Sequence, residues 1–178
     1  MAPVPRRIVL TGSESTGKTT LAKALAGHLG TPWVPEFSRT YAESKGGPLT
    51  AADVEPIARG QAAAELAALA GQSGGLIVFD TDLVSTVVYA RHYYGAVPSW
   101  IGATIRRYPP SLYLLCDIDL GWIADGIRDR PAQRTAIQTE FRDTLCEFGF
   151  KPVEIQGTGA ARLASAIEAV SQIRFLLT

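Results

Sequence analysis

The segment from Gly12 to Thr19 constrains the fold of this chain more than any other part of its sequence. It reads Gly-Ser-Glu-Ser-Thr-Gly-Lys-Thr and matches the pattern GxxxxGK[ST] in full. The run Arg6–Thr11 before it is apolar like a buried strand, and after it leucines recur at every fourth position within residues 18–29, which is helical spacing. A glycine-rich turn between a strand and a helix directs backbone N–H groups and the positive end of the helix dipole at an anion. The sequence therefore predicts a phosphate-binding loop.

The residue types in this loop have expected roles in binding ATP. We expect the ammonium of Lys18 to neutralise charge on the β- and γ-phosphates, and the hydroxyl of Thr19 to bind Mg²⁺. The alternative is an accidental glycine-rich turn, which the full match and its flanking elements disfavour. The predicted ATP-binding residues are Gly12, Ser13, Glu14, Ser15, Thr16, Gly17, Lys18, Thr19, Thr20 and, far along the chain, Arg130.

Short apolar runs alternate with longer helical patterns along the rest of the chain. Further strands are expected at Trp33–Pro35, Leu76–Phe79, Leu112–Cys116 and Pro152–Ile155. Helices are expected at residues 18–29, 48–70, 82–94, 98–107, 135–148 and 162–176, with Thr50 capping the second. This alternation predicts an α/β fold, with a five-stranded parallel sheet and helices on both faces, of the three-layer type of P-loop nucleoside monophosphate kinases. We expect one domain, residues 1–178, with a lid at about residues 119–135.

Charge and composition narrow the possible partners. The 178 residues include 17 basic and 17 acidic side chains, so no broad basic surface is expected to bind nucleic acid or a membrane. Cys116 and Cys146 form no metal-binding pair, and Cys116 lies in an apolar run typical of a buried position. No apolar run reaches the length of a membrane-spanning helix. We therefore expect a cytoplasmic protein with small-molecule partners.

Carboxylates at strand ends are candidates for metal binding and proton transfer. Asp80 ends the apolar run at 76–79 and is expected to reach Mg²⁺ together with Thr19. Asp82 either faces the same site or caps the following helix. Glu36 follows the short strand at 33–35 and is either an acceptor-binding carboxylate or an exposed loop residue. The arginines Arg128, Arg130 and Arg134 either close over the phosphates or form a solvated charged segment.

Several segments together resemble the ribosylnicotinamide kinase domain of NadR-type proteins. They are GSESTGKTTL, PEFSR, FDTD, the Tyr-Tyr-Gly stretch at 93–95 and WIADGIR at 122–128, in the same order over almost the whole chain. The resemblance implies transfer of the ATP γ-phosphoryl group to the 5′-hydroxyl of nicotinamide riboside, giving nicotinamide mononucleotide, with Mg²⁺ as cofactor. By matching position it implies that Lys18 and Thr19 bind ATP·Mg²⁺, that the riboside is surrounded by Glu36, Arg39, Asp82, Trp122 and Asp125, and that Arg128 belongs to the lid. We expect catalytic roles for Lys18, Glu36, Asp82 and Arg128, with Glu36 or Asp82 deprotonating the 5′-hydroxyl, and we expect Tyr41 to contact the substrate as well.

The chain departs from this family pattern in two places. NadR-type proteins join the kinase to a nucleotidyl-transfer domain with an HxGH motif, which this sequence does not contain, so we expect a free-standing kinase. The family tends to have Trp just before the Glu of the PEFSR-like segment, where this chain has Pro35. Trp33, Tyr41 or Trp122 is then expected to stack on the nicotinamide ring.

The charge of nicotinamide riboside gives a further expectation about its site. A pyridinium cation is attracted to carboxylates and to aromatic faces. The sequence offers both, in Glu36, Asp82 and Asp125 and in the aromatic residues Trp33, Tyr41, Tyr89 and Trp122. A kinase for another nucleoside or small alcohol, and a regulatory ATPase without an acceptor, remain alternatives.

Overall fold

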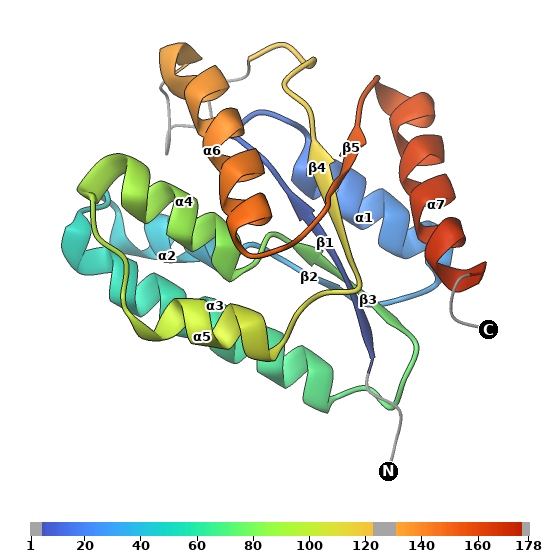
Figure 1. The fold of residues 1–178 in the computed structure, drawn as a ribbon, viewed down its shortest axis with the longest axis horizontal. Helices are drawn as coiled ribbons and strands as arrows, with labels where there is room; N and C mark the ends of the chain where they lie inside the picture. The colour runs from blue at the N-terminus through green and yellow to red at the C-terminus, as the bar shows by residue number, and fades with distance from the viewer. Residues whose placement is uncertain (1–4, 123–130, 176–178) are drawn as a thin grey trace.

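A five-stranded parallel sheet forms the centre of the computed structural model, which describes residues 5–122 and 131–175 (Figure 1). The strands are β1 (Arg6–Thr11), β2 (Trp33–Val34), β3 (Leu76–Asp80), β4 (Leu112–Cys116) and β5 (Val153–Ile155). They lie in the order β2-β3-β1-β4-β5, and each neighbouring pair is parallel. Leu10 of β1 is in register with Asp80 of β3, so the two strands end side by side. The predicted sheet is confirmed.

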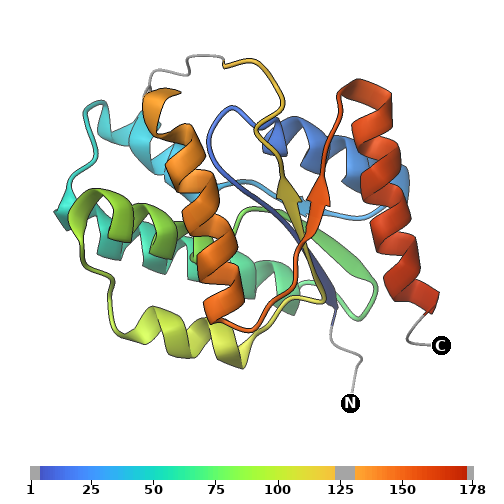
Figure 2. The same cartoon turned by 45° about the horizontal axis from the view of Figure 1, so that its top comes forward.

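Helices cover both faces of the sheet (Figures 1 and 2). The helices are α1 (Lys18–Leu29), α2 (Phe37–Lys45), α3 (Val54–Ala70), α4 (Leu83–Tyr94), α5 (Trp100–Arg107), α6 (Arg134–Glu147) and α7 (Gly159–Phe175), with 3-10 turns at Ala51–Asp53 and Pro131–Gln133. Helices α1 and α7 pack on one face and α3 to α6 on the other. None of the described helices is long and apolar enough to cross a membrane.

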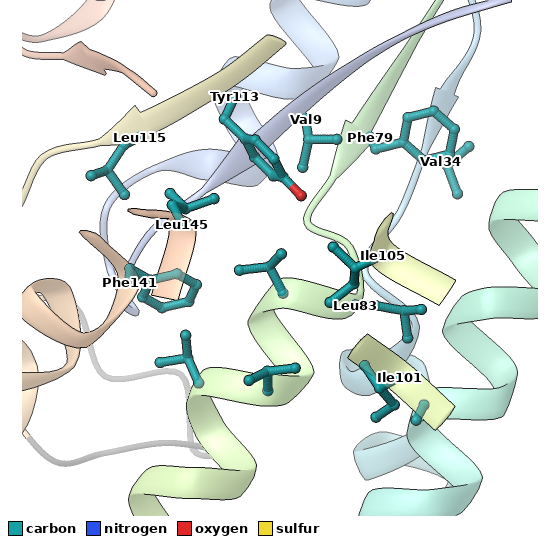
Figure 3. Close-up of a cluster of buried hydrophobic side chains, with 14 of the residues drawn as sticks. Val9, Val34, Phe79, Leu83, Ile101, Ile105, Tyr113, Leu115, Phe141 and Leu145 are labelled. Carbon is teal, nitrogen blue, oxygen red and sulfur yellow. The ribbon is translucent and has the colours of Figure 1, made fainter. Parts of the chain in front are cut away.

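Alternating side chains of the strands build two separate cores. In β1, Ile8 and Leu10 point toward α1 and α7, whereas Val9 points toward the helices of the opposite face. Figure 3 shows the second of these cores, in which Phe79 and Tyr113 of the sheet meet Phe141 and Leu145 of α6 and residues of α4 and α5. Cys116 is buried, as predicted. Because both faces are covered, the ends of the strands are the place left for a site.

The structure departs from the predicted elements mainly at α2. This helix had not been expected, and Glu36 therefore lies at its N-cap rather than in an open loop. Thr50 caps the turn at Ala51–Asp53 through a capping box with Asp53, as predicted for a helix start. Helix α7 begins at Gly159, three residues before the predicted start. The helix predicted at 48–70 starts later, as the 3-10 turn at Ala51–Asp53 followed by α3 from Val54. The remaining element boundaries differ from the predicted ones by two residues or fewer.

Helix α2 is held against α3 at a point where only glycine fits. A Cβ atom on Gly60 would overlap the ring of Phe37, the first residue of α2. We expect Gly60→Ala to lower the free energy of unfolding by about 1–3 kcal/mol, because the ring must shift and carries the start of α2 with it. The control is Gly27→Ala in α1, where an added Cβ meets nothing within 4 Å and should raise stability by up to about 1 kcal/mol. Urea denaturation of both variants measures the difference, and equal shifts would contradict the packing argument.

Candidate active site

The turn between β1 and α1 has the backbone of a phosphate-binding loop. Gly12 has φ +129°, and a Cβ atom there would lie 2.7 Å from the carbonyl oxygen of Cys116. Gly17 is left-handed at the N-cap of α1. The backbone N–H of Ser13 donates to Oε1 of Gln138 at 2.9 Å, which ties the loop to α6. Both glycines of the motif are therefore required by the backbone.

Two arginines far along the chain brace this loop. Arg162 of α7 is 4% exposed, and its Nη2 donates to the carbonyl of Thr16 at 2.9 Å while its Nη1 pairs with Asp119 at 2.7 Å. Nη2 of Arg134, at the start of α6, donates to the carbonyl of Ser15 at 2.9 Å. No role for Arg162 is predictable from the sequence, since nothing in its local pattern points to the loop.

A cavity of about 550 Å³, here called the loop cavity, opens beside the turn. It is lined by residues 14–21, Ala24, Glu36, Arg39, Leu120, Gly121, Gly159, Ala160, Arg162 and Leu163. Lys18 bends back over the loop, where its Nζ donates to the carbonyl of Ser13 at 2.6 Å. The residues predicted for ATP from Glu14 to Thr20 all line this cavity, and Gly12 and Ser13 form the turn beneath it.

Thr19 and Asp80, the two residues predicted to bind a divalent metal, contact each other. The hydroxyl of Thr19 donates to Oδ2 of Asp80 at 2.6 Å. Oδ1 of Asp80 is buried and has no hydrogen-bond partner among the described residues. Burial raises the pKa of Asp80, and the charge of nearby Glu36 adds to this effect. An unpartnered carboxylate oxygen beside a hydroxyl fits the oxygen ligands that Mg²⁺ prefers.

A second cavity of about 230 Å³, here called the α4 cavity, lies along one face of α4. Its lining is Glu36, Ser38, Pro48, Leu49, Thr50, Val54, Ile57, Gln61, Thr81, Asp82, Ser85, Thr86, Tyr89, Ala90, Tyr93 and Tyr94. Thr81 and Asp82 lie just before the start of α4, whereas Tyr93 and Tyr94 lie at its end, so one end of the cavity is polar and the other aromatic. This lining includes two carboxylates and no basic side chain.

Glu36 and Glu14 connect the two cavities. Glu36 is buried at the N-cap of α2, accepts a hydrogen bond from the Ser38 hydroxyl and lines both cavities. Glu14 of the phosphate loop lines the loop cavity, and its Oε2 accepts a hydrogen bond at 3.0 Å from the hydroxyl of Tyr89, which lines the α4 cavity. The α4 cavity therefore adjoins the loop cavity at these residues.

Asp82 caps α4 and also belongs to a buried polar network. Its Oδ1 accepts from the backbone N–H of Val84 at 3.0 Å and its Oδ2 from the Tyr113 hydroxyl at 2.6 Å. Burial raises its pKa, against the opposing charge of Arg7. Arg7 pairs with Glu65, whose pKa burial raises to about 7. The capping alternative is thus observed, and a catalytic role for Asp82 stays a prediction.

The other predicted substrate residues are spread over the structure. Arg39 lines the loop cavity, close to Asp80. Tyr41 donates to Asp53 at 2.9 Å, and Trp122 lies 6.0 Å from the guanidinium of Arg134; the described lining of the two cavities includes neither aromatic ring.

The remaining predictions concern one other ring and the lid. Trp33 lies in β2 under the ammonium of Lys23, and it is not part of the described lining of either cavity. Asp125, Arg128 and Arg130 lie outside the described residues. Of the predicted aromatic residues, Tyr89 lines the α4 cavity. Tyr93 and Tyr94 line it as well, although they were not predicted to bind the substrate. The available signal was the four-residue spacing from Tyr89 to Tyr93, which places both rings on one face of a helix.

The fold and these two cavities define a P-loop domain of the kinase-like type. The chain belongs to the AAA domain family, whose model matches residues 7–162. It is 31% identical over 147 residues to the trifunctional NAD biosynthesis/regulator protein NadR of Escherichia coli K12 and 30% identical over 154 residues to that of Salmonella typhimurium LT2. These alignments cover 80% of this chain but 35% and 37% of the relatives, so the chain spans about a third of their length.

Solved structures agree with the sequence relatives. A NadR protein in complex with NR and a NadR protein in complex with NAD and AMP-PNP each match with a TM-score of 0.80 and 27% identity. The matches cover 96% of this chain and 52% and 49% of those chains. A thymidylate kinase from Ehrlichia chaffeensis matches with a TM-score of 0.69 at 15% identity, over 96% of this chain and 100% of that one, which shows the shared fold alone. The resemblance to NadR-type proteins predicted from the sequence is confirmed.

Proposed function

We propose that this protein is an ATP-dependent kinase that phosphorylates the 5′-hydroxyl of a nucleoside, with nicotinamide riboside as the favoured acceptor and nicotinamide mononucleotide as the product. The observation that carries the proposal is the α4 cavity, which adjoins the phosphate loop and has two carboxylates, three tyrosines and no basic side chain in its described lining. The NadR structures with NR, taken as nicotinamide riboside, and with AMP-PNP support the same pair of ligands.

ATP is assigned to the loop cavity. The backbone from Gly12 to Thr19 and the ammonium of Lys18 would hold the phosphates. Thr19 and Asp80 would hold Mg²⁺, which supplies positive charge to the β- and γ-phosphates. The residues of α7 that line the loop cavity would contact the rest of the nucleotide. Arg128 and Arg130, within a lid at about 119–135, are proposed to neutralise charge on the transferred group.

The charge of the α4 cavity favours a nucleoside over a nucleotide as the acceptor. A monophosphate carries negative charge, and binding it commonly requires arginine or lysine. Glu36 and Asp82 would repel it, whereas they attract a fixed pyridinium cation. Tyr89, Tyr93 and Tyr94 offer aromatic surfaces to such a cation. Nicotinamide riboside meets both conditions, and a nucleoside monophosphate meets neither.

Transfer requires that the acceptor hydroxyl lose its proton as it attacks phosphorus. We assign this proton to Glu36, because its carboxylate lies where the two cavities meet. The 5′-oxygen then bonds to the γ-phosphorus, and the bond from that phosphorus to the bridging oxygen breaks to release ADP. Lys18 stabilises the charge that develops on the phosphoryl oxygens. Asp82 would hold the start of α4 in place beside the acceptor, through its hydrogen bonds to Val84 and Tyr113.

A panel of acceptors of different charge tests the proposal. Nicotinamide riboside, uridine and thymidine monophosphate are compared as acceptors with labelled ATP and Mg²⁺. We expect the highest kcat/KM for the cationic riboside, a lower value for the neutral nucleoside and no transfer to the monophosphate. Preferred transfer to the monophosphate would contradict the charge argument and indicate a nucleotide kinase instead.

A further inference from the structure

Thr81 occupies a backbone conformation that its side chain disfavours. It lies between Asp80, which ends β3, and Asp82, which caps α4, and its φ is +71°. Its backbone N–H donates to the carbonyl of Leu10 in β1 at 2.9 Å, which fixes the residue at the carboxyl end of the strands. A β-branched residue at positive φ is rare, because Cβ crowds the backbone, and such strain tends to persist at functional positions.

The hydroxyl of Thr81 is buried without a partner. The residue is 3% exposed, and its Oγ1 has no hydrogen-bond partner among the described residues. A buried hydroxyl that makes no hydrogen bond destabilises the folded protein. Glycine would relieve the backbone strain, and valine would remove the unpaired group. Neither fold stability nor packing accounts for threonine here.

Thr81 lies where a ligand in the α4 cavity would be next to it. Thr81 lines the polar end of the α4 cavity, together with Glu36, Asp82 and Ser85. It is one residue from Asp80, whose Oδ1 is buried without a hydrogen-bond partner among the described residues, and it lies at the opposite end of α4 from Tyr93 and Tyr94. A nucleoside with its base at the tyrosines therefore has its sugar at Thr81.

We infer that Thr81 is a specificity-determining residue, whose hydroxyl binds a sugar hydroxyl of the acceptor close to the one that is phosphorylated. This inference rests on the proposed nucleoside kinase activity. A threonine hydroxyl both donates and accepts, so it suits a sugar hydroxyl, which does the same. Binding relieves the unpaired state of Oγ1, and the acceptor thereby gains affinity from a group that weakens the free protein.

The test compares Thr81→Val with Thr81→Ser. Valine keeps the shape and the β-branch and removes only the hydroxyl, whereas serine keeps the hydroxyl. For Thr81→Val we expect the KM for nicotinamide riboside to rise about three- to tenfold, an unchanged KM for ATP, and a Tm equal to or above that of the wild type. Thr81→Ser should restore the acceptor KM to within about twofold. A structural role for the hydroxyl would instead lower the Tm of Thr81→Val.

A second arm separates this inference from the proposed function. The wild type and Thr81→Val are titrated by calorimetry with nicotinamide riboside and with its 2′-deoxy and 3′-deoxy analogues. We expect one of the deoxy analogues to bind both proteins equally, because the hydroxyl that Thr81 binds is missing. If the wild type binds the riboside and Thr81→Val binds it equally well, the inference about Thr81 is wrong and the kinase proposal stands. If the wild type binds no nucleoside at all, both fall.

Discussion

Glu36→Gln is expected to lower kcat for phosphorylation of nicotinamide riboside about 10²- to 10³-fold, with little change in ATP affinity. Glutamine keeps the shape of the side chain but is not a base, so the 5′-hydroxyl would have to lose its proton without help. Glu36 lies at the N-cap of α2. Among the described residues, it is the carboxylate that lines both the loop cavity and the α4 cavity. Steady-state kinetics with calorimetry of ATP binding provide the two measurements.

The control for this variant is Glu43→Gln. Glu43 lies on the same helix and is exposed, so its substitution makes the same change of net charge away from the cavities. Its kcat should equal that of the wild type. If Glu36→Gln retained full turnover, Glu36 would not accept the proton, and Asp82→Asn would become the next variant to measure.

Lys18→Ala is expected to lower kcat by about 10²- to 10³-fold and to raise the KM for ATP. Removing one preorganised cation from a site of phosphoryl transfer has effects of this size. The ammonium of Lys18 already lies over the loop, 2.6 Å from the Ser13 carbonyl, so it needs little movement to reach a phosphate. The same kinetic assay, run over a range of ATP concentrations, separates the two effects.

Lys23→Ala is the matched control for the lysine variant. Lys23 is exposed on the same helix, with its Nζ 5.1 Å from the centre of the Trp33 ring and outside both cavities. Loss of this contact affects stability by about 1 kcal/mol at most and should leave kcat unchanged. Equal losses of activity in both lysine variants would mean that a general change of charge, and not the phosphate loop, accounts for the result.

The sheet and the phosphate loop were predictable because their information is local. Strand β1, the loop and α1 follow one another in the chain, and the apolar runs of β3 and β4 are buried on both faces. Helix α2 was missed because its own sequence is weakly helical and buries only Ala42. Its position depends on the packing of Phe37 against Gly60 of α3, which is a contact between distant residues.

The part of the site that lies in local sequence motifs was predictable, and the part that depends on contacts between distant residues was not. Lys18, Thr19 and Asp80 follow from motifs at the ends of adjacent strands, and the structure brings Thr19 and Asp80 together. Arg162, 146 residues from Thr16, could not be assigned, because only the fold brings α7 to the loop. Aromatic rings were harder still, since a ring in a sequence gives no sign of whether it packs in a core or lines a cavity.

In the proposed reaction, one bound ATP delivers its γ-phosphoryl group to a nucleoside in the α4 cavity. The most direct test incubates the protein with ATP, Mg²⁺ and nicotinamide riboside and quantifies the products by mass spectrometry. We predict nicotinamide mononucleotide and ADP in a one-to-one ratio, with ADP formation dependent on the riboside. ADP that accumulates at the same rate with or without riboside, and without nicotinamide mononucleotide, would contradict the account.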